Sequence, residues 1–280
     1  MPPTPFTLTA PSGRTLYGLV DLPDDPGPRP TVVICHGFKG FMEWGFFPHV
    51  AALLAERGVV AVRFNFSGAG MRPGDELVTD PAAFRANTYA KEQEDLRAVL
   101  GALGTEIAPG RTDVERLGLF GHSRGGAAIL AAAASDEYRD RVKALVTWAA
   151  IGRIDRVGRE ELALWRHDGE MPVVNARTGQ RLALGPEALA EVENPPPGLD
   201  LPAAAARRRA PWLIVHGTED ESVPADEGRA MAESAADPKE LLLVEGGSHT
   251  LGARHPFAGP TPPLITALNA TQTWLRRHLS

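Results

Sequence analysis

The chain has a single cysteine, Cys35, so it cannot form an internal disulfide, and nothing in it requires an oxidising compartment. Cys35 ends a short apolar run, where a small buried side chain is the simplest interpretation and a thiol nucleophile is not indicated. The first residues, Met1 to Pro5, contain no basic stretch followed by an apolar one, and no uninterrupted apolar run of about 18 residues occurs in the chain. We therefore predict a cytoplasmic protein without a membrane-spanning segment.

Basic residues are in the minority, with 29 lysines and arginines against 35 acidic residues and a formal net charge of -6. Such a surface repels nucleic-acid phosphates and anionic lipid headgroups, so neither nucleic acid nor a membrane is an expected partner. The only basic run, Arg207 to Arg209, follows four alanines, and we predict a solvated helix end there. No cluster has metal-ligand spacing, so we expect no metal. The oligomeric state is not decided by the sequence, and a homodimer stays open.

Apolar runs alternate with segments of helical periodicity, which is the pattern of parallel βαβ units. Continuous apolar runs of this kind are typical of strands buried on both faces of a sheet. The predicted fold class is therefore α/β, with a mostly parallel central sheet flanked by helices. Strands are predicted at Phe6–Ala10, Leu16–Leu22, Thr31–Cys35, Val59–Phe64, Leu117–Phe120, Val142–Ala149, Pro211–His216 and Leu241–Val244. Helices are predicted at Phe47–Arg57, Asn87–Leu103, Ser123–Ser135, Asp226–Ala236 and Leu264–Leu279.

The segment Gly121-His122-Ser123-Arg124-Gly125 stands between a predicted strand and a predicted helix. A serine hydroxyl is a poor nucleophile unless a base takes its proton, and a sharp strand-to-helix turn exposes it to such a base. The flanking glycines are needed because the turn crowds the neighbouring backbone. We predict Ser123 as a catalytic nucleophile. The alternative is a glycine-rich turn that carries an idle serine.

Three segments carry a family resemblance: the turn around Ser123, the tripeptide His36-Gly37-Phe38, and the loop from Arg63 to Gly70. The sequence resembles the α/β-hydrolase superfamily over nearly its whole length. Within that superfamily it resembles the bacterial dienelactone-hydrolase-like and cinnamoyl (feruloyl) esterase-like group. The resemblance implies an α/β-hydrolase fold and hydrolysis of carboxylic esters through an acyl-enzyme, without a cofactor.

Two departures from that group matter. Dienelactone hydrolases proper use a cysteine where this chain has Ser123, so their activity is not implied. In such esterases the strand-end loop often reads Arg-Phe-Asp and has an arginine before its glycine. Asn65 and Ser67 stand at those two positions here, so no buried ion pair is expected between them.

The acid of the predicted triad follows from the resemblance, because α/β-hydrolases present serine, acid and histidine in that chain order. The segment His216–Pro224 is similar to the family's His-Gly-x-x-Asp-x-x-Val-Pro stretch, which places Asp220 at the acid position. Its role would be to orient the histidine and to stabilise the imidazolium. Glu219 and Glu221 are adjacent rivals. Neighbouring side chains in a tight loop point in different directions, so only one can reach the imidazole.

The predicted histidine is His249, in Gly246-Gly247-Ser248-His249-Thr250. This segment lies directly after the last apolar strand, which favours His249 over the other seven of the eight histidines. His255, a few residues further on, is its main competitor.

An oxyanion hole needs preorganised N–H donors. One is expected to be the backbone N–H of Arg124, which follows the nucleophile. The second comes from the turn after the first central strand, His36 to Gly40, which resembles the family's His-Gly-x turn. Phe38 N–H is the predicted donor. The alternative is a plain turn at a strand end.

Between Ala149 and Pro211 lie roughly 60 residues, far more than a βα connection needs. We predict an α/β-hydrolase core formed by residues 1–149 and 210–280, with residues 150–209 as a lid or cap. Met171–Leu184 is predicted to be a β-hairpin and Pro186–Glu193 a short helix. Aromatic side chains are expected to line the substrate pocket: Trp165 and Trp148 on one wall, and Phe38, Phe41, Trp44 and Phe46 on the other. Each of them can instead pack the lid against the core.

The leading prediction is a serine carboxylesterase that acts on small to medium esters, aromatic ones included. A serine peptidase or acylaminoacyl hydrolase with the same triad is the second hypothesis. A non-catalytic member that only binds a ligand is the third. A small-molecule ester is the expected partner.

Overall fold

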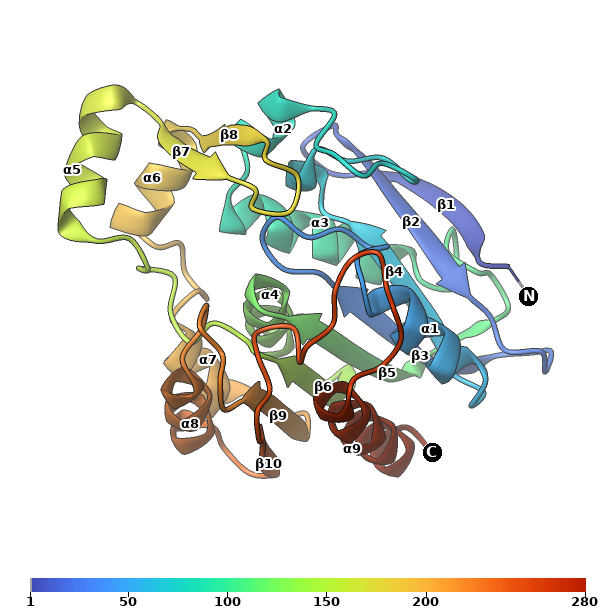
Figure 1. The fold of residues 1–280 in the computed structure, drawn as a ribbon. Coiled ribbons are helices and arrows are strands. Elements are labelled where there is room, and N and C mark those ends of the chain that lie inside the picture. The colour runs from blue at the N-terminus through green and yellow to red at the C-terminus, as the bar shows by residue number, and fades with distance from the viewer. Residues whose placement is uncertain (1) are drawn as a thin grey trace.

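The computed structural model describes residues 2–280, which form one large sheet covered by helices (Figure 1). The strand order in this sheet is β1-β2-β4-β3-β5-β6-β9-β10, and a separate two-stranded sheet pairs β7 with β8. The strands are β1 (Thr4–Thr9), β2 (Thr15–Asp21), β3 (Arg29–Cys35), β4 (Val60–Asn65), β5 (Thr112–His122), β6 (Val142–Trp148), β7 (Met171–Val174), β8 (Arg181–Leu184), β9 (Trp212–Gly217) and β10 (Lys239–Val244).

The helices lie mainly between the strands in chain order. They are α1 (Phe47–Ala55), α2 (Pro81–Arg85), α3 (Tyr89–Ala102), α4 (Arg124–Ala133), α5 (Arg159–Asp168), α6 (Pro186–Glu193), α7 (Leu201–Arg207), α8 (Ala225–Ser234) and α9 (Pro262–Leu279), with one 3₁₀ turn, η1 (Ser67–Ala69).

Strands β4, β3, β5, β6, β9 and β10 pair in parallel, whereas β1 pairs antiparallel with β2, and β2 with β4. Every residue of β4 and β9 is buried, as expected for strands covered on both faces, and this explains why most of their residues are apolar. The predicted α/β-hydrolase fold with a mostly parallel sheet is confirmed by this topology and by the comparisons below.

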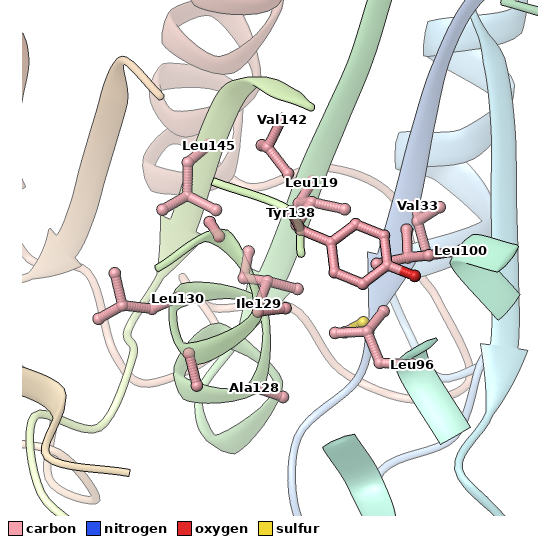
Figure 2. Packing of buried hydrophobic residues seen from close by; sticks show 14 of the residues in the cluster. Val33, Leu96, Leu100, Leu119, Ala128, Ile129, Leu130, Tyr138, Val142 and Leu145 are labelled. Carbon is pink, nitrogen blue, oxygen red and sulfur yellow. The ribbon is translucent and has the colours of Figure 1, made fainter. Parts of the chain in front are cut away.

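The sheet separates two apolar cores. Side chains of α3, α4 and α7 pack on one face, and those of α1 and α9 pack on the other. Figure 2 shows the first core, where Leu96 and Leu100 of α3 and Ile129 of α4 meet Val33 and Leu119 of the sheet. Helix α4, which follows the predicted nucleophile, is buried along its whole length. Its position is therefore fixed by packing on all sides.

Helices α2 and α5 were not predicted, and of α7 only the C-terminal end at Arg207 was. Helix α5 is mostly charged and buries only Trp165, so its apolar periodicity is weak. Helices α2 and α7 are short, and each begins at an aspartate cap, Asp80 or Asp200, whose side chain accepts an N–H of the first turn. Strand β5 is also longer than predicted, because its polar first half pairs with Arg29 and Pro30.

The segment predicted as a lid, residues 150–209, contains β7, β8, α5, α6 and α7 (Figure 1). The predicted hairpin and the helix Pro186–Glu193 are both present. Its middle part forms a third apolar cluster with Phe41 and Phe84, through Trp165, Val173 and Leu184. Its two ends differ, because Ile151, Ile154, Leu199, Leu201, Ala204 and Ala205 pack into the core around α4.

The basic run at the end of α7 is not wholly solvated, contrary to the prediction. Arg207 and Arg209 are exposed, but Arg208 is only 2% exposed. Its guanidinium donates to the backbone carbonyls of Ala210 and Ala236. It therefore joins the end of this segment to the loop after α8.

Among residues 2–280, none of the helices combines the length and apolar character needed to cross a bilayer.

A matched pair of leucine substitutions tests the packing. Leu96 is fully buried in the first core, whereas Leu164 on α5 is 62% exposed. We expect Leu96→Ala to lower the free energy of unfolding by about 2–5 kcal/mol, and Leu164→Ala to change it by less than about 0.5 kcal/mol. Chemical denaturation of both variants measures this. Similar losses in the two would contradict the assigned packing.

Candidate active site

Ser123 occupies a sharp turn between β5 and α4. Its backbone has φ 56° and ψ -122°, a conformation that residues with a side chain rarely adopt. Ser123 N–H donates to Trp148 O at 2.9 Å, and Gly126 N–H donates to Ser123 O at 2.9 Å. Strand β6 and helix α4 therefore hold the turn from two sides and place the serine at the N-terminus of α4, at the carboxyl edge of the sheet.

The glycines on either side of Ser123 are required by close backbone contacts. A Cβ at Gly125 would lie 2.4 Å from His36 O, and one at Gly121 would lie 2.5 Å from Gly125 O. A Cβ at Gly37 would lie 2.9 Å from Ser123 Cβ. The absence of these three side chains lets α4 rest directly on the end of β3. The turn after β3 consequently lies beside the serine.

Asp220 and His249 come together from the loops after β9 and β10. His249 Nδ1 lies 2.8 Å from Asp220 Oδ2 and 3.1 Å from Asp220 Oδ1. The carboxylate is fully buried, whereas the imidazole is 22% exposed. Asp220 Oδ1 also accepts the backbone N–H groups of Ser222 and Val223, at 2.9 and 2.8 Å. The imidazole is thus fixed through Nδ1, which leaves Nε2 for proton transfer.

The charge of Asp220 is stabilised in spite of its burial. Burial acts to raise the pKa of the carboxyl group, but hydrogen bonding with His216, His249 and the Val223 N–H outweighs it and holds the pKa well below its usual range. Asp220 therefore stays ionised at neutral pH and can stabilise an imidazolium at His249.

The rival residues have other positions. Glu219 and Glu221 are exposed, whereas Asp220 is buried. His255 Nδ1 accepts Gly45 N–H at 2.9 Å, and its Nε2 lies 2.8 Å from Glu76 Oε2. The structure therefore pairs His249, and not His255, with Asp220.

The turn after β3 is held by His36. The ring Nδ1 lies 2.9 Å from Gly37 O, and Nε2 accepts Phe66 N–H at 3.1 Å. Burial lowers the pKa of His36 to about 4, so the ring is neutral with its proton on Nδ1. Gly40 N–H donates to Gly37 O, and Lys39 has φ 60°. Within the described residues, neither Phe38 N–H nor Arg124 N–H donates to a backbone carbonyl, so both remain available to a ligand.

Two cavities meet at the serine. The larger, about 350 Å³, extends below the predicted lid and is lined by Tyr89, Arg124, Ile154, Arg156, Trp165 and Leu184, among others. The smaller, about 160 Å³, is lined by Gly40, Trp44, Phe47 and Thr250, among others. Ser123, His249 and Phe38 line both cavities. A molecule whose reacting bond lies at Ser123 would therefore extend into both cavities.

The aromatic residues predicted to form the walls of the substrate pocket have different positions in the structure. Trp165 lines the larger cavity and Trp44 the smaller. Trp148 does not reach a substrate, because it is fully buried under the turn and its Nε1 donates to Thr271 Oγ1 at 3.0 Å. Phe46 and Phe41 are also buried, at 0% and 2% exposure, and pack in apolar clusters.

The departures at Asn65 are accommodated by neutral hydrogen bonds. Asn65 Oδ1 accepts Met42 N–H at 2.7 Å, and Nδ2 donates to Met71 O at 3.1 Å. A different buried ion pair is present on the same strand, between Arg63 Nε and Asp21 Oδ2 at 3.0 Å. The amide ties β4 to the loops at Met42 and Met71, and the ion pair ties β4 to the end of β2.

His122 is a site residue that sequence reasoning did not identify. Its Nε2 lies 2.9 Å from His249 O, and its ring centroid lies 4.7 Å from that of His249. Burial is the main cause that lowers the pKa of His122 to about 3, so the ring is neutral and Nε2–H donates to the carbonyl. The residue before the serine therefore positions the loop that carries His249. The sequence signal that could have identified His122 is its position between a predicted strand and the predicted nucleophile.

Among residues 2–280, no three histidine, cysteine or acidic side chains gather in a way that could hold a metal ion. Cys35 is buried, and burial raises the pKa of its thiol well above the ordinary value.

The fold and the geometry of this site define the class of protein: an α/β hydrolase with a serine at the strand-to-helix turn. The chain belongs to the family described as serine aminopeptidase, S33, whose profile matches residues 26–176.

Two curated relatives and two solved structures illustrate the relationship. A monoacylglycerol lipase of Mycolicibacterium smegmatis is 25% identical and covers 91% of each chain. An uncharacterized 31.7 kDa protein from the traX-finO intergenic region of Escherichia coli is 25% identical and covers 78% of this chain and 82% of its own. Est1E from Butyrivibrio proteoclasticus with ferulic acid bound has a TM-score of 0.75 at 23% identity and covers 98% of this chain and 99% of its own. The esterase domain of a Rhodothermus marinus protein has a TM-score of 0.68 at 23% identity and covers both chains fully. The structural similarities establish the fold.

The role of His122 can be tested by a substitution that keeps an aromatic ring but removes the hydrogen-bond donor Nε2–H. We expect His122→Phe to lower kcat by about tenfold or more, because small displacements of a catalytic group are costly. His122→Gln, which retains a side-chain N–H, should recover part of the loss. Steady-state kinetics of both variants, with thermal unfolding as a control, provide the measurement. A normal kcat in His122→Phe would show that His249 does not depend on this contact.

The buried carboxyl group of Asp95 makes the stability of the protein depend on pH, and this dependence can be tested. Burial raises the pKa of its carboxyl group to about 6, although Ser67 N–H donates to Oδ2 at 2.7 Å. The pKa of this carboxyl group is therefore about 6 in the folded protein and 3.8 in the unfolded chain. Between these two pH values the folded protein binds more protons than the unfolded chain. Ionised Asp95 therefore lowers the free energy of unfolding progressively as the pH rises through this window.

We expect Asp95→Asn to stabilise the protein relative to wild type at pH 7.5 by up to about 3 kcal/mol, and by about a third as much at pH 4.5. Urea unfolding at both pH values measures the difference. Asp136→Asn, an exposed position on the loop after α4, serves as the control. An Asp95→Asn gain that is larger at pH 4.5 would contradict the stated sign.

Proposed function

We propose that this protein is a serine carboxylesterase that hydrolyses small to medium carboxylic esters through an acyl-enzyme. The observation that carries the proposal is the pairing of His249 with a buried, ionised Asp220 at a cavity that also holds Ser123. This is the arrangement by which a base takes the proton of a serine hydroxyl.

The proposed reaction has two halves. His249 Nε2 accepts the proton of Ser123 Oγ as the oxygen attacks the ester carbonyl, and the N–H groups of Phe38 and Arg124 stabilise the oxyanion. The tetrahedral intermediate collapses to the acyl-enzyme, and His249 gives the proton to the departing alcohol. Water then attacks the acyl-enzyme by the same steps, releases the acid and restores Ser123.

The relatives support an ester substrate, because one of them is named a monoacylglycerol lipase and Est1E is described with ferulic acid bound. The aromatic side chains of Phe38, Tyr89 and Trp165 in the larger cavity suit acyl groups of that size. We also propose that residues 150–209 form a lid, since Trp165, Met171 and Leu184 from this segment supply one wall of the cavity.

The family description also supports a second candidate, an aminopeptidase. Such an enzyme must bind the ammonium group at the N-terminus of its substrate, which requires a carboxylate or other acceptors. The larger cavity is lined by Lys39, Arg124 and Arg156, and none of its lining residues, all of them within the described chain, is acidic. This charge distribution favours uncharged or negatively charged esters over aminoacyl substrates.

A substrate panel separates the candidates. We expect p-nitrophenyl and feruloyl esters to be hydrolysed, aminoacyl p-nitroanilides to be poor substrates, and Ser123→Ala to lose at least about 1000-fold in kcat. Glu221→Gln, which changes a neighbouring exposed carboxylate, should retain activity. Preferential cleavage of the anilides would favour the aminopeptidase. Full ester hydrolysis by Ser123→Ala would exclude the proposed nucleophile.

A further inference from the structure

The larger cavity has an unusual charge for this protein. The chain carries a net charge of -6, yet the charged residues that line the cavity in the described structure are Lys39, Arg124 and Arg156. Their acidic partners, Glu92 and Glu227, are not lining residues. A substrate in this cavity therefore meets positive groups and apolar surface.

Two of the three cations are already engaged. Arg156 pairs with Glu227 and donates Nη2–H to Ser222 O at 2.9 Å. Lys39 is exposed, and its Nζ lies 3.5 Å from Val174 O. Arg156 and Lys39 both contact loops around the cavity. Each therefore has a partner within the protein and needs none from a ligand.

Arg124 is different, because its guanidinium is fixed but incompletely bonded. Its Nε donates to Glu92 Oε2 at 2.7 Å, and Glu92 in turn accepts Asn87 Nδ2–H at 2.8 Å. The guanidinium carbon lies 3.7 Å from the ring centroid of Tyr89 and 5.5 Å from that of Phe38. These aromatic contacts leave Nη2, on the hydrogen-bonding edge of the guanidinium, without an acceptor.

That edge has donors without acceptors. Arg124 Nη2 is buried and has no hydrogen-bond partner, and the same holds for Nε1 of Trp165 in the wall of the same cavity. A buried donor without a partner costs about 1–3 kcal/mol, and more when it is charged. Both residues line the larger cavity, so an occupant that brings acceptor oxygens to them would supply the missing partners.

We propose that the larger cavity binds an acyl group that carries a carboxylate, so that the preferred substrates are half-esters of dicarboxylic acids. This inference rests on the proposed esterase function and specifies its substrate class. The guanidinium edge of Arg124 binds the carboxylate, with the Trp165 N–H as an additional donor. The ester carbonyl lies at Ser123, and a small alcohol group occupies the cavity at Trp44. Arg124 is then a specificity residue through its side chain, in addition to the proposed role of its backbone N–H.

The wild-type enzyme gives the first test. Matched p-nitrophenyl esters of equal length, the monoester of glutaric acid and the ester of pentanoic acid, differ mainly in the terminal carboxylate. We expect kcat/KM to be about tenfold or more higher for the glutarate ester, in line with a charge-assisted hydrogen bond. Equal rates, or a faster pentanoate ester, would overturn the inference while leaving the esterase proposal intact.

Two variants shift the ratio of these rates in opposite directions. Arg124→Gln removes the cation, so the glutarate preference should be lost. Glu92→Gln keeps an acceptor near Nε and removes the compensating charge, so the preference should increase. Arg276→Gln, which removes an exposed cation on α9, should leave the ratio unchanged. A ratio unaffected by both cavity variants would contradict the assignment. The ratio compares two substrates of one protein, so a general loss of activity does not obscure it.

Binding tests the inference without catalysis. Titration calorimetry of Ser123→Ala with monomethyl glutarate and with methyl pentanoate should show at least tenfold tighter binding of the glutarate. If esters were not substrates but this difference in affinity persisted, the proposed function would fail and the carboxylate site would stand. If esters were hydrolysed and the affinities were equal, only the carboxylate site would fail.

Discussion

The backbone at Ser123 is held in a conformation that costs of order 1–3 kcal/mol for a residue with a side chain. The surrounding structure maintains it, through the hydrogen bond to Trp148 O and through the packing of Gly125 against the end of β3. The same packing brings the turn that contains Phe38 next to the serine. Because α4 is buried along its length, this turn cannot relax without disturbing the apolar core. The position of the serine and of the proposed oxyanion donors is therefore a consequence of one close helix-to-strand contact.

Buried histidines connect the loops that surround this turn. His36 joins the turn after β3 to Phe66, His122 binds the carbonyl of His249, and His216 lies 2.8 Å from Val223 O in the loop of Asp220. Burial lowers the pKa of His36 and His122, so these rings are neutral and act as fixed hydrogen-bonding groups. Because these contacts involve backbone atoms, each loop is fixed by its main chain, and its functional side chain remains free for chemistry.

The sequence predicted the central strands, the longer helices and the pairing of Asp220 with His249, because these depend on apolar periodicity and on local motifs. It did not predict α2 and α5, and gave only the C-terminal end of α7, because these helices are short or largely charged and derive their stability from tertiary contacts. Trp148 was placed in the substrate pocket, since sequence alone does not show which face of a strand end is covered by α9. The buried position of Arg208 and the role of His122 depend on backbone carbonyls that come from distant segments, which no local pattern reveals.

The central claim is that Ser123 is a nucleophile activated by His249. It is tested most directly by brief exposure of the protein to diethyl p-nitrophenyl phosphate, followed by intact mass measurement and peptide mapping. The account predicts one diethylphosphoryl group per chain, attached to Ser123, and no adduct in His249→Ala over the same time. A folded protein that remains unmodified, or that carries the group on another residue, would contradict it.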